Sequence, residues 1–168
     1  MEVHPVKMPV VFLVALALGL SACAGAGTGG STTFGSAPYP PDVYQHRVST
    51  NEVEIYWTCT APGAGTQRVE GVVRNSKGGV VKFMELELDA VDAQERYGAS
   101  AKTALPVIKL FANQLAPFAL QLSAGADTQR LDLFYNYERD AASGDAQQVR
   151  FLALDVCSPT QHRVRQQG

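Results

Sequence analysis

Within the segment 80–91, an alternation of apolar and acidic side chains from Met84 to Ala90 is the strongest constraint on the fold. Successive side chains of an extended chain point to opposite faces. One face of this segment is therefore apolar (Met84, Leu86, Leu88 and Ala90) and the other acidic (Glu85, Glu87 and Asp89). The pattern predicts a β-strand with one buried face.

Six further segments have the composition of short strands, with turn residues between them: 52–60, 67–74, 102–111, 117–123, 130–138 and 148–157. Such spacing predicts an all-β, antiparallel, immunoglobulin-like β-sandwich of about seven strands. Pro106 places the 102–111 strand at a sheet edge or breaks it, because proline cannot donate a hydrogen bond to a neighbouring strand. A short helix over 106–114 is the alternative for that stretch.

Two connections are less regular. The glycine-containing stretch 75–79 predicts a hairpin turn with positive φ angles. In the last strand, Phe151 and Leu152 are both apolar although they point to opposite faces. Either the strand is central and covered on both faces, or a bulge changes its phase. The face that carries Cys157 is therefore left open.

The beginning of the chain predicts export. Residues 8–20 are almost wholly apolar and follow Lys7, but this run is too short to cross a bilayer as a helix and fits a secretory signal. Leu20, Ser21, Ala22 and Cys23 then resemble the lipobox of bacterial lipoproteins, in which cleavage precedes a lipid-bearing cysteine. The resemblance implies lipid on Cys23; an ordinary signal with a chance cysteine is the alternative.

Four regions follow from this reading. Residues 1–22 are the signal peptide, and 23–41 are the lipidated cysteine and a tether of mostly Gly, Ala, Ser, Thr and Pro. As a flexible coil this tether has an end-to-end distance of roughly 20–25 Å. Residues 42–158 form the sandwich and 159–168 a polar tail. Ala24, rather than an aspartate, follows the cysteine. By resemblance to enteric lipoproteins this implies the periplasmic face of the outer membrane in an organism that has one.

The cysteine count agrees with export. Lipid on Cys23 leaves Cys59 and Cys157, 98 positions apart, and an oxidising compartment favours a disulfide between them. Two buried thiols are the alternative. A loop of that length is worth roughly 4–5 kcal/mol in the chain-entropy model. Trp57 shares a strand face with Cys59 and should pack beside the bond.

Part of the sandwich resembles a known family. Residues 69–75 are similar to the Gly-x-Val-x-Asn opening of the FxLYD-like domains of exported bacterial proteins. Residues 88–92 stand in the frame of the Phe-x-Leu-Tyr-Asp motif, with Asp92 identical and Glu95 where a turn glycine is common. Residues 115–118 resemble the proline turn into the next strand. The resemblance covers about residues 53–156 and implies a fold, not an activity.

Charge and composition exclude several function classes. The chain carries a formal charge of −2, and removal of residues 1–22 takes away one acidic and one basic residue, so no basic surplus suggests nucleic acid. His46 and His162 fall in the tether exit and the tail, so no Ser-His-Asp arrangement is expected. We predict no catalytic residue, no metal site and no cofactor.

The remaining candidates for catalysis or metal binding are acidic residues. Glycoside hydrolysis needs two carboxylates on one surface, and four acidic residues could supply them: Glu85, Glu87, Glu54 and Asp132. The alternative is that an acidic strand face keeps the protein soluble and discourages pairing of sheet edges. Asp89 and Asp92 lack the looped oxygen ligands of a calcium site, and we expect a solvated face for the first and an Asx turn for the second.

A candidate partner-binding surface lies in residues 131–138. If Leu131, Leu133, Tyr135 and Tyr137 face the core, then Asp132, Phe134, Asn136 and Glu138 share the outer face. An exposed Phe134 among polar groups could anchor an envelope protein or a glycan; a covered second face is the alternative reading.

The sequence thus predicts a non-enzymatic envelope lipoprotein acting as a binding or accessory module. A carbohydrate-active or hydrolytic accessory domain, or a structural spacer, is the alternative.

The lipobox gives a direct prediction. Cys23→Ala should abolish incorporation of labelled fatty acid and leave an unprocessed precursor, because no other cysteine lies near a cleavage point. Metabolic labelling and mass measurement check this, with Cys59→Ala as the control that keeps its lipid. Labelled Cys23→Ala protein would overturn the assignment.

Overall fold

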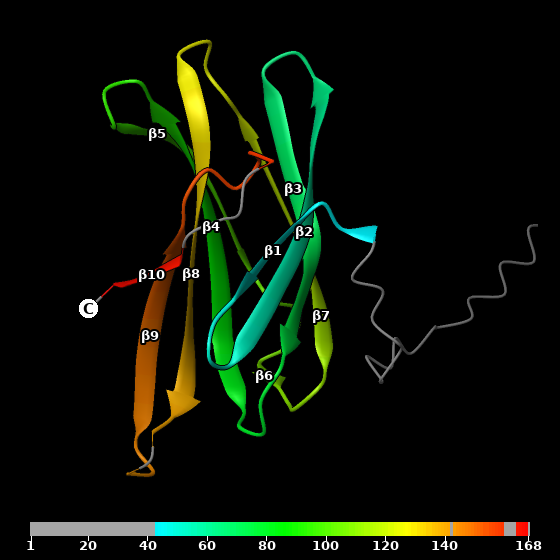
Figure 1. Cartoon of the computed structure of the whole chain (residues 1–168), viewed down its shortest axis with the longest axis vertical. Helices are drawn as coiled ribbons and strands as arrows, with labels where there is room; N and C mark the ends of the chain where they lie inside the picture. The colour runs from blue at the N-terminus through cyan, green and yellow to red at the C-terminus, as the bar shows by residue number, and fades with distance from the viewer. Residues whose placement is uncertain (1–42, 142, 160–163, 168) are drawn as a thin grey trace, which may run out of the picture. The chain divides into compact units, whose positions relative to one another are not determined.

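The described part of the chain, residues 43–141, 143–159 and 164–167 of a computed structural model, forms ten β-strands in two antiparallel sheets (Figure 1). The four-stranded sheet has the order β1-β2-β3-β7: His46–Ser49, Val53–Gly63, Thr66–Asn75 and Leu115–Ser123. The six-stranded sheet has the order β10-β9-β8-β4-β5, with β6 also paired to β4: Val164–Gln167, Ala146–Ala153, Thr128–Asp140, Val81–Asp92, Tyr97–Ala104 and Lys109–Leu110. The predicted signal peptide, Cys23, the tether and His162 lie outside the described residues.

The predicted all-β sandwich is confirmed. Among the described strands, β2, β3, β4, β5, β7, β8 and β9 have eight or more residues. β3 pairs with β7 in one sheet, while β4, β8 and β9 are neighbours in the other. Between the described strands the chain crosses from one sheet to the other three times, after β3, after β6 and after β7. The first and last of these crossings correspond to the B–C and E–F connections of immunoglobulin-like domains. No helix among the described residues is long and apolar enough to cross a membrane.

The hairpin predicted at residues 75–79 is wrong. β3 and β4 belong to different sheets, and neither Gly78 nor Gly79 has a positive φ. The buried Asn75 side chain organises this crossing: its amide donates to the carbonyls of Gly79 (2.7 Å) and Leu110 (2.8 Å), and its oxygen accepts from the backbone N–H of Lys77 (3.1 Å).

The strand expected over 102–111 is interrupted. β5 is an edge strand of its sheet that ends at Ala104, and only Lys109–Leu110 pair again, with β4. The alternative helix over 106–114 is also wrong, since these residues form an irregular loop around β6. Pro106 falls in the break, as its missing N–H requires.

The chain after β9 differs from the expected strand and tail. β9 ends at Ala153, and Asp155 turns the chain with a positive φ of 51°, so Cys157 lies in a turn rather than on a strand face. Residues 164–167 of the expected polar tail form β10, which makes β9 an inner strand. Leu152 is accordingly covered on the outer face while Phe151 lies in the core.

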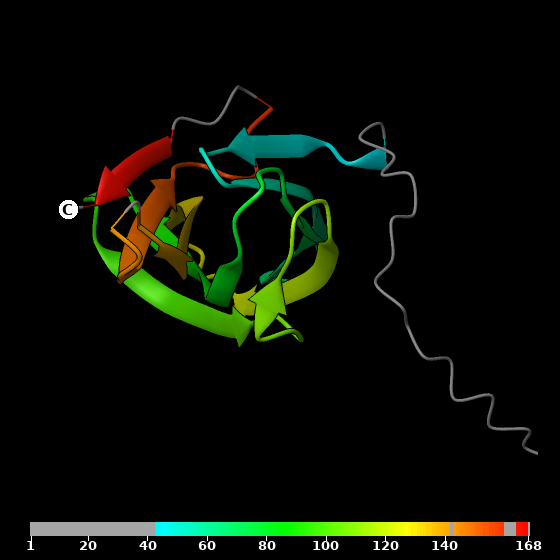
Figure 2. The ribbon, with the colours of Figure 1, turned by 90° about the horizontal axis from the view of Figure 1, so that it is seen from below.

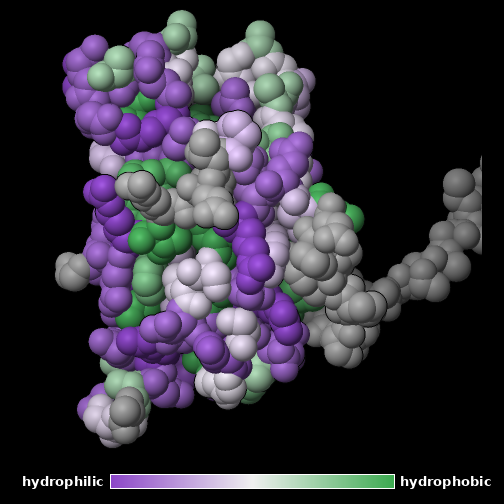
Figure 3. All heavy atoms as spheres, in the orientation of Figure 1, coloured by the Kyte–Doolittle hydropathy of each residue, from purple (hydrophilic) through white to green (hydrophobic). Residues whose placement is uncertain are grey.

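The core lies between the two sheets (Figure 2). It contains the predicted inward side chains of β2, β4 and β8: Val53, Ile55, Trp57, Met84, Leu86, Leu88, Ala90, Leu131, Leu133, Tyr135 and Tyr137. In the view of Figure 3, hydrophobic residues show between the sheets, and the outer sides are mainly hydrophilic. Burial of these side chains is the main force that holds the sheets together.

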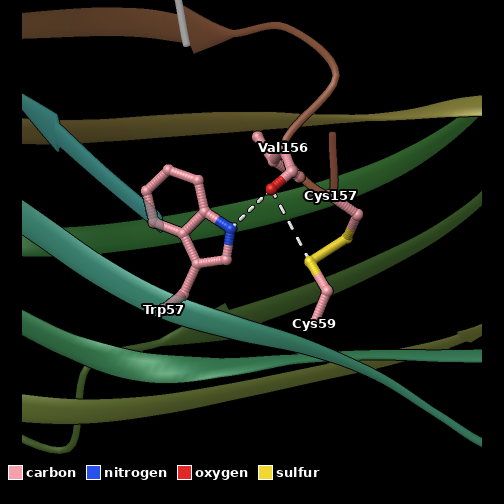
Figure 4. The surroundings of a disulfide bond; sticks show 4 residues. All are labelled: Trp57, Cys59, Val156 and Cys157. Carbon is pink, nitrogen blue, oxygen red and sulfur yellow. Dashed lines mark hydrogen bonds between the residues drawn. A yellow bond between two sulfur atoms is a disulfide. The ribbon is translucent and has the colours of Figure 1, made fainter. Parts of the chain in front are cut away.

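A covalent and hydrogen-bonded clasp joins β2 to the turn after β9 (Figure 4). The predicted disulfide between Cys59 and Cys157 is confirmed, with the Cα atoms 5.6 Å apart. The fully buried Trp57 indole donates to the Val156 carbonyl at 2.7 Å, beside the bond as expected. The Cys59 sulfur lies 3.6 Å from the same carbonyl, a contact without a proton because the sulfur is bonded to Cys157.

Gly71 in β3 explains one position of the family-like motif. A Cβ atom there would lie 1.8 Å from the Tyr56 carbonyl oxygen and 2.8 Å from the Trp57 Cα. Both obstacles are backbone of the neighbouring strand β2, so side-chain rotation cannot relieve the clash. The position therefore requires glycine for close approach of the two strands.

We predict that Gly71→Ala destabilises the domain by about 3 kcal/mol or more, because β2 and β3 must separate to admit the methyl group. Thermal unfolding should show a fall in Tm of about 10 °C or more. Gly63→Ala is the control, since an added Cβ there meets nothing within 4 Å. Equal Tm values for the two variants would contradict the argument.

Candidate functional site

The outer face of the six-stranded sheet carries three rows of polar and aromatic side chains. Antiparallel pairing of β5, β4, β8 and β9 sets the members of each row side by side. The first row is Ala104, Glu85, Asn136 and Arg150. The second is Lys102, Glu87, Phe134 and Leu152, and the third is Ser100, Asp89 and Asp132. None of these side chains belongs to the core cluster. The predicted alternation of β8 is therefore correct, and this surface is called the outer face below.

Phe134 lies on the outer face but is not exposed. Only 8% of its surface is accessible, because the Arg150 guanidinium lies 4.8 Å above its ring and Tyr97 packs at 5.8 Å between ring centroids. Of the two readings of Phe134 that the sequence left open, the covered face is therefore correct and the exposed aromatic anchor is wrong. Tyr97, 53% exposed, and Arg150 present the accessible surface there instead.

Asp132 is fully buried rather than part of an accessible surface. Its carboxylate accepts from Arg130 Nε and from the backbone N–H of Asp155, both at 3.0 Å. Arg130 also donates twice to Glu95 at 2.6 Å, and these hydrogen bonds raise the pKa of Arg130. Glu95 has a positive φ of 60°, which explains why a turn glycine would suit this position.

Asp89 stands directly opposite Asp132 in the sheet. Like charges in facing positions oppose one another, and Asp89 is only 9% exposed. Burial raises the pKa of Asp89, and the nearby Glu87 and Asp132 raise it further. The expectation of a solvated Asp89 is therefore wrong.

A hollow of about 330 Å³ opens on the outer face between β5, β4, β8 and β9. Glu85, Lys102, Phe134, Asn136 and Arg150 contribute to its lining. The hollow forms because small residues stand among long ones: Ala104 and Asn136 flank Glu85 on either side. The amide oxygen of Asn136 is buried and has no hydrogen-bond partner among the described residues.

Glu87 forms the ionic wall of this hollow. Its carboxylate accepts from Lys102 at 2.8 Å and from the Ser100 hydroxyl at 3.1 Å, and lies 3.9 Å from Arg150. Partial burial opposes ionisation, but the hydrogen bonds from Lys102 and Ser100 outweigh it and lower the pKa of Glu87. A general acid needs the opposite shift, so the geometry suits ion pairing and recognition better than proton donation.

The other sequence candidates are dispersed. Glu54, in the other sheet, pairs with Arg47 and Arg74. Glu138 lies 3.7 Å from Lys82, away from the hollow. His46 falls in β1, where its ring stacks on Trp57 at 5.6 Å, so its expected place outside the sandwich is wrong.

Asp92 does form the predicted turn, accepting from the backbone N–H groups of Gln94 (2.8 Å) and Arg96 (3.0 Å). Across the described residues, no three His, Cys, Asp or Glu side chains gather where they could hold a metal ion. Sequence reasoning missed Lys102 and Arg150. Both alternate with inward residues on their strands, but nothing local shows that β5 and β9 flank β4 and β8.

Comparison with known proteins gives this chain a distant structural neighbour. No family model matches the chain, and no curated protein matches it, so the FxLYD-like resemblance stays a prediction. Among solved structures, the chain is similar to the crystal structure of a yeast GGA1 GAE domain, with a TM-score of 0.48 and 12% identity, over 66% of this chain and 97% of that one. A likeness so distant carries no argument about function.

The raised pKa of Asp89 gives a prediction about stability. The folded state disfavours the ionised carboxylate, so this site is most stable at pH values below the unfolded pKa of about 3.9 and loses stability as pH rises through the folded pKa. Asp89→Asn should therefore raise the Tm at about pH 7, and the gain should shrink toward about pH 3. Thermal unfolding across that range checks this, with the exposed Asp145→Asn as control. A gain independent of pH would contradict the explanation.

Proposed function

We propose that this protein is a lipid-anchored, non-enzymatic envelope lipoprotein whose sandwich binds a partner through the outer face. The observation that carries the binding role is the hollow with the unpartnered Asn136 amide oxygen. A buried acceptor without a donor costs roughly 1–3 kcal/mol. A partner N–H or O–H group that enters the hollow would remove that cost.

The chemistry of the hollow suits an uncharged polar partner segment. Lys102 and Arg150 offer donors, whereas Glu85, Glu87 and Asn136 offer acceptors, and the two signs balance. A polypeptide main chain presents both donors and acceptors, and the exposed parts of Tyr97 and Arg150 supply contact area beside them. We therefore favour an envelope protein as the partner, with a glycan as the competing ligand.

The membrane part of the proposal is supported by the sequence. The Leu20–Cys23 tetrad supplies the lipid attachment point, and Ala24 supports the periplasmic face of an outer membrane. An acyl anchor with more than one chain holds a protein stably at a bilayer. A binding module carried on such an anchor would serve in the assembly or maintenance of an envelope complex.

Site-specific photo-crosslinking in cells tests the binding role. A benzoylphenylalanine in place of Lys102, at the hollow, should form an adduct with a defined envelope protein. The same residue in place of Gln121, which is exposed on β7 of the other sheet, is the matched control. Identical adducts from both positions, or none from Lys102, would refute the outer face as the binding site.

Asn136→Leu should separate binding from stability. The substitution removes an unpaired buried acceptor, so the Tm should stay the same or rise, while the adduct at position 102 should disappear. Gln121→Leu is the control: it lies on the other sheet, so it should leave both the Tm and the adduct at position 102 unchanged.

The hydrolytic alternative has its own test. It would be supported if the purified chain released soluble sugar from envelope glycan and the Glu87→Gln variant did not. Membrane fractionation of the same cells checks the outer-membrane location.

A further inference from the structure

A second surface lies where β4 begins. Three large apolar side chains are exposed there: Phe83 at 59%, Ile108 at 66% and Phe111 at 50%. The Phe83 N–H donates to the Ile108 carbonyl at 3.0 Å, and Phe111 follows directly after β6, which pairs with β4 (Figure 1). These three residues are called the apolar tip.

The backbone of Phe83 is unusual for an aromatic residue. Its φ is 49°, in the left-handed region that bulky side chains rarely adopt. The register of β4 shifts between Lys82 and Glu85, so Phe83 is an extra residue of a bulge. Val81 before it and Met84 after it are both buried. The bulge therefore turns Phe83 outward, away from the core.

The two segments that carry the apolar tip are basic. Segments 75–84 and 105–114 contain Lys77, Lys82 and Lys109 and no aspartate or glutamate, although the whole chain has a net charge of −2. Lys82 is compensated by two carboxylates of β8, Asp140 at 2.7 Å and Glu138 at 3.7 Å. Lys77 and Lys109 are exposed, and neither forms an ion pair with any described residue.

We propose that the apolar tip inserts into the interface of an anionic phospholipid bilayer. Aromatic and aliphatic side chains enter the boundary between headgroups and acyl chains, and adjacent lysines attract anionic headgroups. Three side chains are too few for a stable protein interface, which needs about 1,000 Å² or more. They are enough to add a second contact to a domain that is already tethered.

This inference rests on the proposed lipid at Cys23 for the proximity of the domain to the bilayer. The described chain begins at Val43, 20 residues after Cys23. An extended segment of that length reaches roughly 65 Å, enough to let the apolar tip touch the bilayer. The tip then orients the domain on the membrane, and the outer face stays available to the partner.

Quenching by brominated lipids tests the proposal on the full chain. Because Cys59 and Cys157 are bonded, Cys23 of a chain purified without lipid supplies the thiol that is coupled to a maleimide lipid. The vesicles contain phosphatidylethanolamine, phosphatidylglycerol and lipids brominated on the acyl chain. The Phe83→Trp variant should be quenched about twofold or more above the Tyr97→Trp variant, whose substitution lies on β5 opposite the far end of β4. The native Trp57 is fully buried and gives the same background in both.

Ile108→Trp provides a second probe in case Phe83→Trp alters the bulge. The proposal is supported if the tryptophan of either tip variant is quenched and if that quenching falls when Lys77 and Lys109 are changed to glutamate. Equal quenching of tip and Tyr97 variants, or none at the tip, overturns it. Chemical coupling makes this result independent of lipidation in cells, so a chain that cells leave unlipidated would refute the anchor without deciding the apolar tip.

Discussion

The arrangement of the described domain depends on the clasp between β2 and the turn after β9. Trp57 and Cys59 project from one sheet, and both reach a segment that continues from the other. The same turn is held from the opposite side, because the Val156 N–H donates to the Leu131 carbonyl at 2.8 Å and the Asp155 N–H to Asp132. The clasp therefore joins the core, the sheet edge and the buried end of the outer face in one connected unit.

The outward polar side chains of the two sheets differ in how fully they are paired. On the four-stranded sheet, Glu54 has two arginine partners and a tyrosine hydroxyl at 3.0 Å. On the six-stranded sheet, Asp89 opposes Asp132, and Asn136 has an acceptor without a donor. A sheet selected for stability alone would not keep buried polar groups in such positions. This contrast is the physical reason for assigning recognition to the outer face.

β4 connects the two proposed surfaces. Its core positions change from odd to even numbers at the bulge, with Val81 inward before it and Met84 inward after it. After the bulge, Glu85 and Glu87 are directed to the hollow. The extra residue, Phe83, is directed to solvent. One inserted residue in a strand thus separates an exposed apolar side chain from the polar outer face on the same element.

The sequence by itself determined the strand faces and the cysteine pair. Alternation at period two is a local property, so the inward residues of β4 and β8 were predictable, and the predicted lipid on Cys23 left Cys59 and Cys157 to bond. Tertiary structure decided what covers each face. Phe134 is covered by Tyr97 and Arg150, from strands on either side of the β4–β8 pair, and no local pattern specifies which strands become neighbours. The crossing after β3 was missed for the same reason, since its choice of sheet depends on long-range pairing and on the buried Asn75 amide rather than on turn residues.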